Sequence, residues 1–184
     1  MVTGVPQSTV DHLEPAPQAE YSDCVAAYWI EPSFDRVAGW CVLQAEEGYE
    51  LQSWELGDSN PVSLRQARES QPKRVALPTE MVTLLAQIWT NVLLDTRYPR
   101  SNVRGADGDV HRFAAFVRET GLQLDGEAWS PRAEAPPKWI AEAGQRLLAF
   151  ARTDGSDTVA VRDDLKRTRD KVFRYYKSRR RHGA

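Results

Sequence analysis

Three segments near the start of the chain have the length and apolar content of β-strands, with turn-forming residues between them. These segments are CVAAYWI, RVAGWCVLQ and YELQSWEL. In the third, Tyr49 and Leu51 alternate with Glu50 and Gln52, a period of two that predicts one wet sheet face. Gly48 supplies the positive φ that a hairpin loop often requires, so the second and third strands are expected to pair.

Three later segments repeat their apolar residues every three to four positions, as helices do. The first is expected to begin at Pro78 and end near Thr96, before Pro99. The second is WIAEAGQRLLAFA, and the third begins near Val159. The third places four residues on one apolar stripe: Val161, Leu165, Val172 and Tyr176.

A second hairpin is expected between the first two helices. The segments VHRFAAFV and LQLDGEAW follow the turn signal Asp107-Gly108 and are joined through Gly121. Residues 58–75 are polar and contain two prolines, so they are interpreted as a connection.

These patterns predict an α+β domain with an antiparallel sheet of about five strands and two to three helices packed on one side. Residues 1–20 are rich in proline and polar side chains and lack a period, so they are expected to form a flexible arm. Residues 21–158 form the predicted globular domain. Residues 159–184 form a basic amphipathic helix that is expected to pack on it.

Composition is that of a globular protein. The 184 residues are 41% hydrophobic and 27% charged, and no window approaches the 18 apolar residues of a membrane helix. The amino terminus lacks the basic start and apolar run of a secretory signal. We therefore expect a cytoplasmic protein that does not enter a membrane.

The net charge of −2 conceals a strong separation of charge along the sequence. Residues 1–60 contain eleven acidic side chains and one basic side chain, whereas residues 161–184 contain ten basic and three acidic ones. An acidic region and a basic end on one molecule favour association with charged partners.

Chemistry-bearing motifs are absent from the sequence. Cys24 and Cys41 lie in apolar stretches and are interpreted as buried thiols. There is no glycine-rich phosphate loop, nucleophile elbow or paired His-Glu metal motif, and no cofactor is expected. The six tryptophans are mostly assigned to the core, but an exposed Trp129 or Trp139 would indicate a partner-binding anchor.

The first functional hypothesis is a non-enzymatic protein that binds another protein, as an adaptor or a toxin-neutralising immunity protein does. This hypothesis rests on the absence of a recognisable set of catalytic residues and on the separation of acidic and basic residues along the sequence. The expected contact surface is an acidic face formed by Glu46, Glu47, Glu50 and Glu55.

The second hypothesis is a nucleic-acid-associated protein, in which basic side chains neutralise phosphates and Tyr175 or Tyr176 stacks on a base. A bland alternative is that the same basic side chains only solvate the end of a helix. The candidate contacts are Arg97, Arg100, Arg104, Arg112, Lys166, Arg167, Arg174, Lys177, Arg179, Arg180 and Arg181.

The third hypothesis is a metal- or phosphate-dependent enzyme. Asp109 and His111 project to one face of an extended strand, and Asp107 would complete a weak metal site beside the nearby arginines. The competing interpretation assigns Asp107 to the turn and packs His111 between strands. That interpretation is favoured, because a metal site demands a fuller ligand set.

Overall fold

The computed structural model describes residues 24–33, 36–55, 72–95, 108–117, 120–132 and 134–182. In these ranges, six strands form one antiparallel sheet in the order β4-β3-β2-β1-β5-β6, with three helices alongside. The elements are β1 (Cys24–Glu31), β2 (Ala38–Ala45), β3 (Gly48–Glu55), β4 (Lys73–Leu77), α2 (Thr79–Leu94), β5 (Val110–Val117), β6 (Leu122–Trp129), α3 (Pro136–Arg152) and α4 (Thr158–His182). The predicted α+β class is confirmed, and the predicted arm at residues 1–20 lies outside the described residues.

The two predicted hairpins are present and lie on either side of β1 in the sheet. Ala45 pairs with Gly48 across the β2–β3 turn, and Gly48 has the positive φ, 111°, that the sequence predicts. Val117 pairs with Leu122 across the β5–β6 turn, where Gly121 also has a positive φ. Antiparallel pairing of β1 with β5 joins these two parts of the chain into one sheet.

A sixth strand lies where the sequence predicts a connection. Residues 58–75 were expected to join two elements, but Lys73–Leu77 forms β4 at one edge of the sheet. This strand has five residues, and only Val75 and Leu77 face the core. Its apolar alternation is too short to be recognised in the sequence. The strand forms because β3 provides a pairing partner, with Leu51 opposite Val75.

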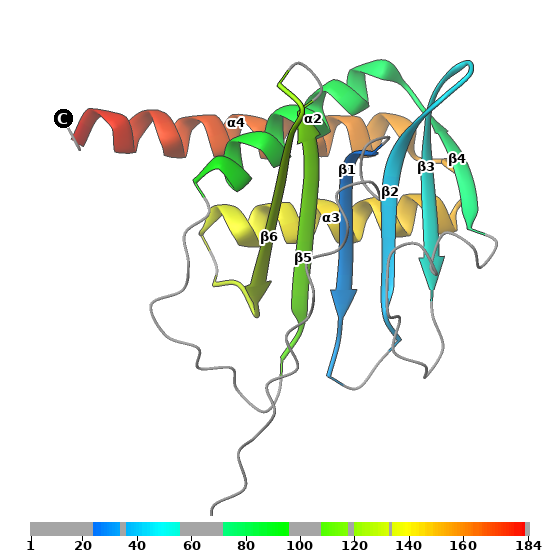
Figure 1. Cartoon of the computed structure of the whole chain (residues 1–184), viewed down its shortest axis with the longest axis horizontal. Coiled ribbons are helices and arrows are strands. Elements are labelled where there is room, and N and C mark those ends of the chain that lie inside the picture. The colour runs from blue at the N-terminus through cyan, green and yellow to red at the C-terminus, as the bar shows by residue number, and fades with distance from the viewer. Residues whose placement is uncertain are drawn as a thin grey trace, which may run out of the picture.

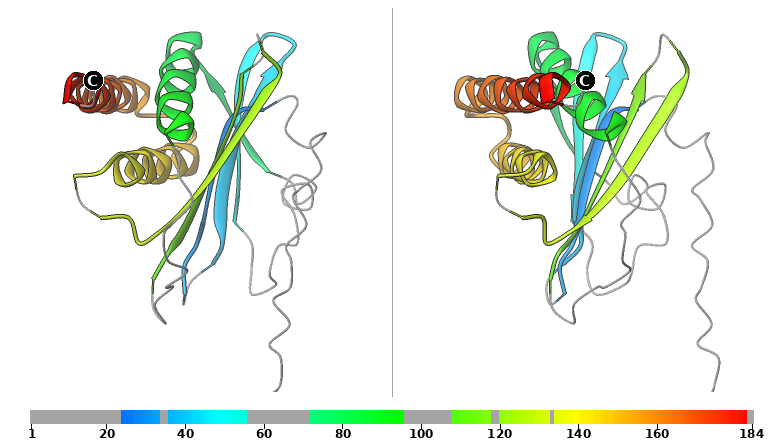
Figure 2. Two further views of the ribbon diagram at one scale, coloured as in Figure 1. Left: turned by 60° about the vertical axis from the view of Figure 1, so that its left-hand side comes forward. Right: turned by 90° about the vertical axis from the view of Figure 1, so that its left-hand side faces the viewer.

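All three helices lie on the same side of the sheet, as Figures 1 and 2 show. α2 leads from β4 at one edge across the sheet towards β5. α2 and α3 pack against the strands, whereas α4 packs on α2 and α3 and forms an outer layer. The predicted stripe of α4 is directed inward: Val161, Leu165 and Val172 are buried.

A layer of aromatic side chains fills the space between sheet and helices. Tyr28, Trp40 and Phe113 come from adjacent strands, and Trp89 comes from α2. The indole Nε1 of Trp89 donates a hydrogen bond to the Ala27 carbonyl at 3.0 Å. The indole of Trp40 donates to the Gly144 carbonyl of α3 at 2.8 Å. Each buried indole donor is therefore satisfied by the backbone of the opposing layer.

Gly144 allows α3 to approach the sheet closely. A Cβ atom at this position would lie 2.6 to 2.7 Å from ring carbons of Tyr28, well inside van der Waals contact. The same residue accepts the hydrogen bond from Trp40. The absence of a side chain at Gly144 and the position of its backbone carbonyl thus set the distance between α3, β1 and β2.

The opposite face of the sheet carries a second apolar cluster. Its members are Cys24, Ala27, Cys41, Leu43, Trp54 and Ala114, with Trp29 packed against them. The ring of Trp54 lies across Gly39, where an added Cβ atom would meet it at 2.6 Å. Gln52 and Trp54 are both buried, so the prediction of one wet face for this strand is wrong. The expected burial of both cysteines is confirmed.

Replacing Gly144 with alanine should destabilise the protein. Alanine gains about 1 kcal/mol of helix propensity over glycine, but overpacking against Tyr28 costs about 1–3 kcal/mol. We expect a net loss of about 1 kcal/mol in the free energy of unfolding, measured by urea denaturation. Gln145→Ala changes an exposed neighbour in the same helix and should alter it by less than about 0.5 kcal/mol. A more stable Gly144→Ala variant would show that the Tyr28 ring does not set the spacing.

Candidate interaction surface

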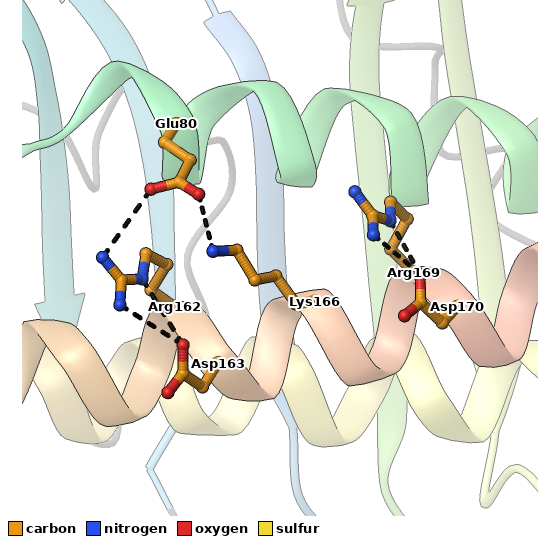
Figure 3. A network of polar contacts seen from close by, with 6 residues as sticks. All are labelled: Glu80, Arg162, Asp163, Lys166, Arg169 and Asp170. Carbon is orange, nitrogen blue, oxygen red and sulfur yellow. Dashed lines mark hydrogen bonds and ion pairs between the residues drawn. The ribbon is translucent and has the colours of Figure 1, made fainter.

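The first half of α4 is held to α2 by ion pairs, which Figure 3 shows. Lys166 lies 2.7 Å from a carboxylate oxygen of Glu80, and Arg162 lies 3.8 Å from the other. The hydrogen bond from Lys166 lowers the pKa of Glu80 below its usual value. The charge of Lys166, predicted as a candidate contact, is thus partly neutralised within the molecule.

Three aspartates neutralise further cations in the first half of α4. Asp163 pairs with Arg162, and Asp170 pairs with Arg169 at 2.7 Å. Asp164 pairs with Arg167 of its own helix and with Arg146 of α3. This half of α4 is therefore bound to its surroundings by opposite charges as well as by buried apolar residues.

The basic end of α4, defined as Lys171–His182, has a different composition. It contains six basic side chains and no acidic one. Four of the cations are exposed and have no ion pair within the described residues: Lys171, Arg174, Lys177 and Arg180. The backbone of this segment projects past the β6 edge of the sheet (Figure 1). Positive charge near the carboxyl end is also favoured by the helix dipole.

Tyr175 and Tyr176 of the basic end pack against the rest of the protein. Tyr175 packs edge-on against Trp139, and Arg179 lies 5.3 Å above the Tyr175 ring and 3.6 Å from Asp95. Burial raises the pKa of Tyr176 to about 12, so its hydroxyl stays protonated at neutral pH. Both tyrosines therefore serve packing first.

Phe173 is the aromatic side chain of this surface that sequence reasoning missed. Its side chain is 41% exposed. It lies off the stripe that contains Val172 and Tyr176, so helical spacing alone would have placed it on the outer side. Phe173 adds an apolar contact to a cationic surface.

The four residues of the predicted acidic face do not form one cluster. Glu46 and Glu47 lie in the β2–β3 turn. Glu50 lies 3.8 Å from Arg74 of β4 on the face away from the helices. Glu55 lies at the far end of β3 and bonds to Arg152 of α3 at 2.7 Å. Two of the four charges are thus engaged within the molecule, at separate places.

Of the arginines predicted around residues 97 to 112, only Arg112 lies within the described residues. Its Nε is 3.3 Å from Glu31 and 3.4 Å from Glu127. This nitrogen is buried and makes no hydrogen bond, so the contact with the two carboxylates is electrostatic. Two neighbouring anions make Arg112 a cross-strand ion pair rather than a site for a further anion. Arg97, Arg100 and Arg104 lie outside the described residues.

His111 is a core residue that faces the helices. Its side chain is 5% exposed, and its Nδ1 lies 2.9 Å from the Tyr28 hydroxyl. Burial lowers the pKa of His111, which favours the neutral imidazole, and its Nδ1 shares a hydrogen bond with the Tyr28 hydroxyl. Asp107 lies outside the described residues, and within them no group of three His, Cys, Asp or Glu side chains is arranged to hold a metal.

Comparison with known proteins gives no match. No family model, no curated protein and no solved structure corresponds to the chain at a significant level. None of the described helices is long and apolar enough to cross a membrane.

Protonation of His111 should reduce the stability of the protein as the pH is lowered. The unfolded chain binds a proton at this histidine near the ordinary pKa of about 6.5, whereas burial lowers its pKa in the folded protein. The stabilisation is therefore complete above about pH 6.5 and decreases as the pH falls towards the folded-state pKa. Between about pH 7.5 and pH 5, the free energy of unfolding should fall more steeply for the wild type than for His111→Gln. Parallel curves in urea denaturation would contradict this.

Proposed function

We propose that this protein is a non-enzymatic binding protein that recognises the acidic surface of a partner protein through the basic end of α4. Adaptors and toxin-neutralising immunity proteins are examples of this class. The observation that carries the proposal is the unequal charge of one helix: its first half is ion-paired, whereas its last three turns have six cations and no anion.

Exposed, fixed cations steer an oppositely charged partner during diffusion and increase its association rate. Packing of Tyr175 and Tyr176 keeps the basic end helical, so its cations have a defined spacing. Phe173 supplies an exposed apolar residue within the same surface, as protein–protein interfaces commonly have at their centre. This combination of charge and aromatic contact favours a folded protein partner.

Nucleic acid is the second candidate, favoured only by the density of cations in the basic end. Two observations oppose it: the whole chain has a net charge of −2, and both tyrosines expected to stack on bases are packed within the protein. If four exposed cations contacted single-stranded nucleic acid, the logarithm of the binding constant would fall with a slope of about −3 against the logarithm of salt concentration.

The test compares three proteins as bait in affinity capture from the native lysate, with and without nuclease. The first variant changes Lys171, Arg174 and Lys177 to glutamate. The control variant makes the same charge change at three other basic residues: Arg74, Arg132 and Lys138. We expect one protein to be captured in stoichiometric amount by the wild type and by the control, with or without nuclease. The amount captured by the first variant should be at least tenfold lower.

Two outcomes would contradict the proposal. If every captured protein disappeared after nuclease treatment, nucleic acid would be the ligand. If the partner bound equally to both variants, the basic end of α4 would not be the contact surface. Circular dichroism and thermal unfolding of each variant establish that the comparison is made between folded proteins.

A further inference from the structure

Two ion pairs show that α2 and α4 lie side by side and run in the same direction. At the start of α2, Lys166 lies 2.7 Å from Glu80 (Figure 3). Directly after α2, Arg179 lies 3.6 Å from Asp95. Asp95 follows Glu80 by fifteen residues and Arg179 follows Lys166 by thirteen, so the two helices stay adjacent along the whole of α2.

Two large apolar side chains are exposed along this pair of helices. Leu94, the last residue of α2, is 62% exposed, and Phe173 of α4 is 41% exposed. Leu94 follows Glu80 by fourteen residues, about four helical turns, so both project from the same side of α2. Phe173 follows Lys166 by seven residues, about two turns, so it projects from the side of α4 nearer α2. Leu94 and Phe173 therefore belong to one surface that spans both helices.

The four exposed cations of the basic end divide between different sides of α4. Lys177 and Arg180 follow Phe173 by four and seven residues, so they lie on its side of the helix. Arg174 is turned away from Phe173 by about 100° and Lys171 by about 160°. We define the α2–α4 surface as the set on the shared side: Leu94, Phe173, Lys177 and Arg180.

We propose that the α2–α4 surface binds an acidic amphipathic helix of the partner protein. This inference rests on the proposed function and names the element by which the partner is recognised. A helix of this kind presents apolar residues on one face, with charged residues beside them. Helices that bind in this way use a few apolar anchors at helical spacing.

The spacing of the two apolar side chains suits one helix. Leu94 is level with the last turns of α4, because the adjacent Asp95 pairs with Arg179. Phe173 precedes Arg179 by six residues, about 9 Å along the helix axis. Residues seven apart on one helical face span about 10 Å. A single partner helix can therefore contact Leu94 and Phe173 together.

The charge of the surface selects an acidic helix. Before Phe173, the carboxylates of Glu80 and Asp170 are paired with Lys166 and Arg169. Beyond Phe173, the same side of α4 presents Lys177 and Arg180, which have no ion pair within the described residues. Carboxylates placed beside the apolar face of the partner helix would therefore meet positive charge.

The probe is an acetylated, amidated peptide of three Leu-Glu-Ala-Leu-Glu-Glu-Ala repeats, titrated into the full-length chain. Its leucines share one helical face. A second peptide has the same composition in an order that distributes the leucines around the helix, so mass and charge are equal. The first peptide should bind saturably and at least tenfold more tightly than the second.

Three outcomes with the wild-type chain would overturn the proposal. The first is equal binding of the two peptides, and the second is no saturable binding of the first peptide up to millimolar concentration. The third is binding of the chain to vesicles that contain anionic phospholipid, without binding of the first peptide. In that case a membrane surface would be the occupant.

Apolar variants locate the site. Leu94→Ala and Phe173→Ala should each weaken binding of the first peptide at least fivefold. Val159→Ala and Leu122→Ala remove side chains that are 62% and 44% exposed and lie outside the α2–α4 surface, so they should change the affinity less than twofold. Unchanged affinity in both Leu94→Ala and Phe173→Ala would overturn the proposal.

Charge variants separate this inference from the proposed function. Changing Lys177 and Arg180 to glutamate should weaken peptide binding at least tenfold, whereas the same change at Lys171 and Arg174 should weaken it less than threefold. Equal losses in the two double variants would mean that the basic end attracts acidic partners without a defined helix site. That result would overturn the inference and leave the proposed function standing. If neither double variant lost affinity, both would be wrong.

Discussion

Two buried indole N–H groups fix the distance between the sheet and its helices. Trp89 of α2 bonds to the backbone of β1, and Trp40 of β2 bonds to the backbone of α3. A buried donor without a partner costs about 1–3 kcal/mol, so neither helix can move away without a penalty. Gly144 permits the close approach, and α4 then packs on the two helices that these bonds position. The orientation of the basic end therefore depends on contacts made deep in the core.

The position of the acidic residues explains why α4 can project. Asp164 and Asp170 lie in the first half of the helix and Glu80 lies beside it, where apolar burial also anchors α4. The last turns gain support from Tyr175 and from the pair between Arg179 and Asp95. In the same turns Lys171, Arg174, Lys177 and Arg180 are exposed to solvent. Attraction between opposite charges holds the first half of α4 in place. In the basic end, water and salt screen the repulsion between like charges.

Elements with a strong local period could be predicted from the sequence, whereas elements that depend on neighbours could not. The hairpins and helices have clear apolar repeats, but β4 exists through its pairing with β3. The basic end was predictable because its cations lie close together in one short segment of the sequence. The acidic face was not, because adjacency in sequence differs from adjacency in space: Glu50 and Glu55 lie about 17 Å apart along a strand. Burial of Trp54 depends on Gly39 of the adjacent strand.

The composition of the two edge strands has a consequence for assembly. A sheet that accepts strands at both edges can propagate into fibres, because each addition creates a new acceptor. In this protein β4 is short and enclosed by prolines, and the acidic side chains of β6 oppose pairing with themselves. Both features disfavour growth of the sheet by copies of the same chain.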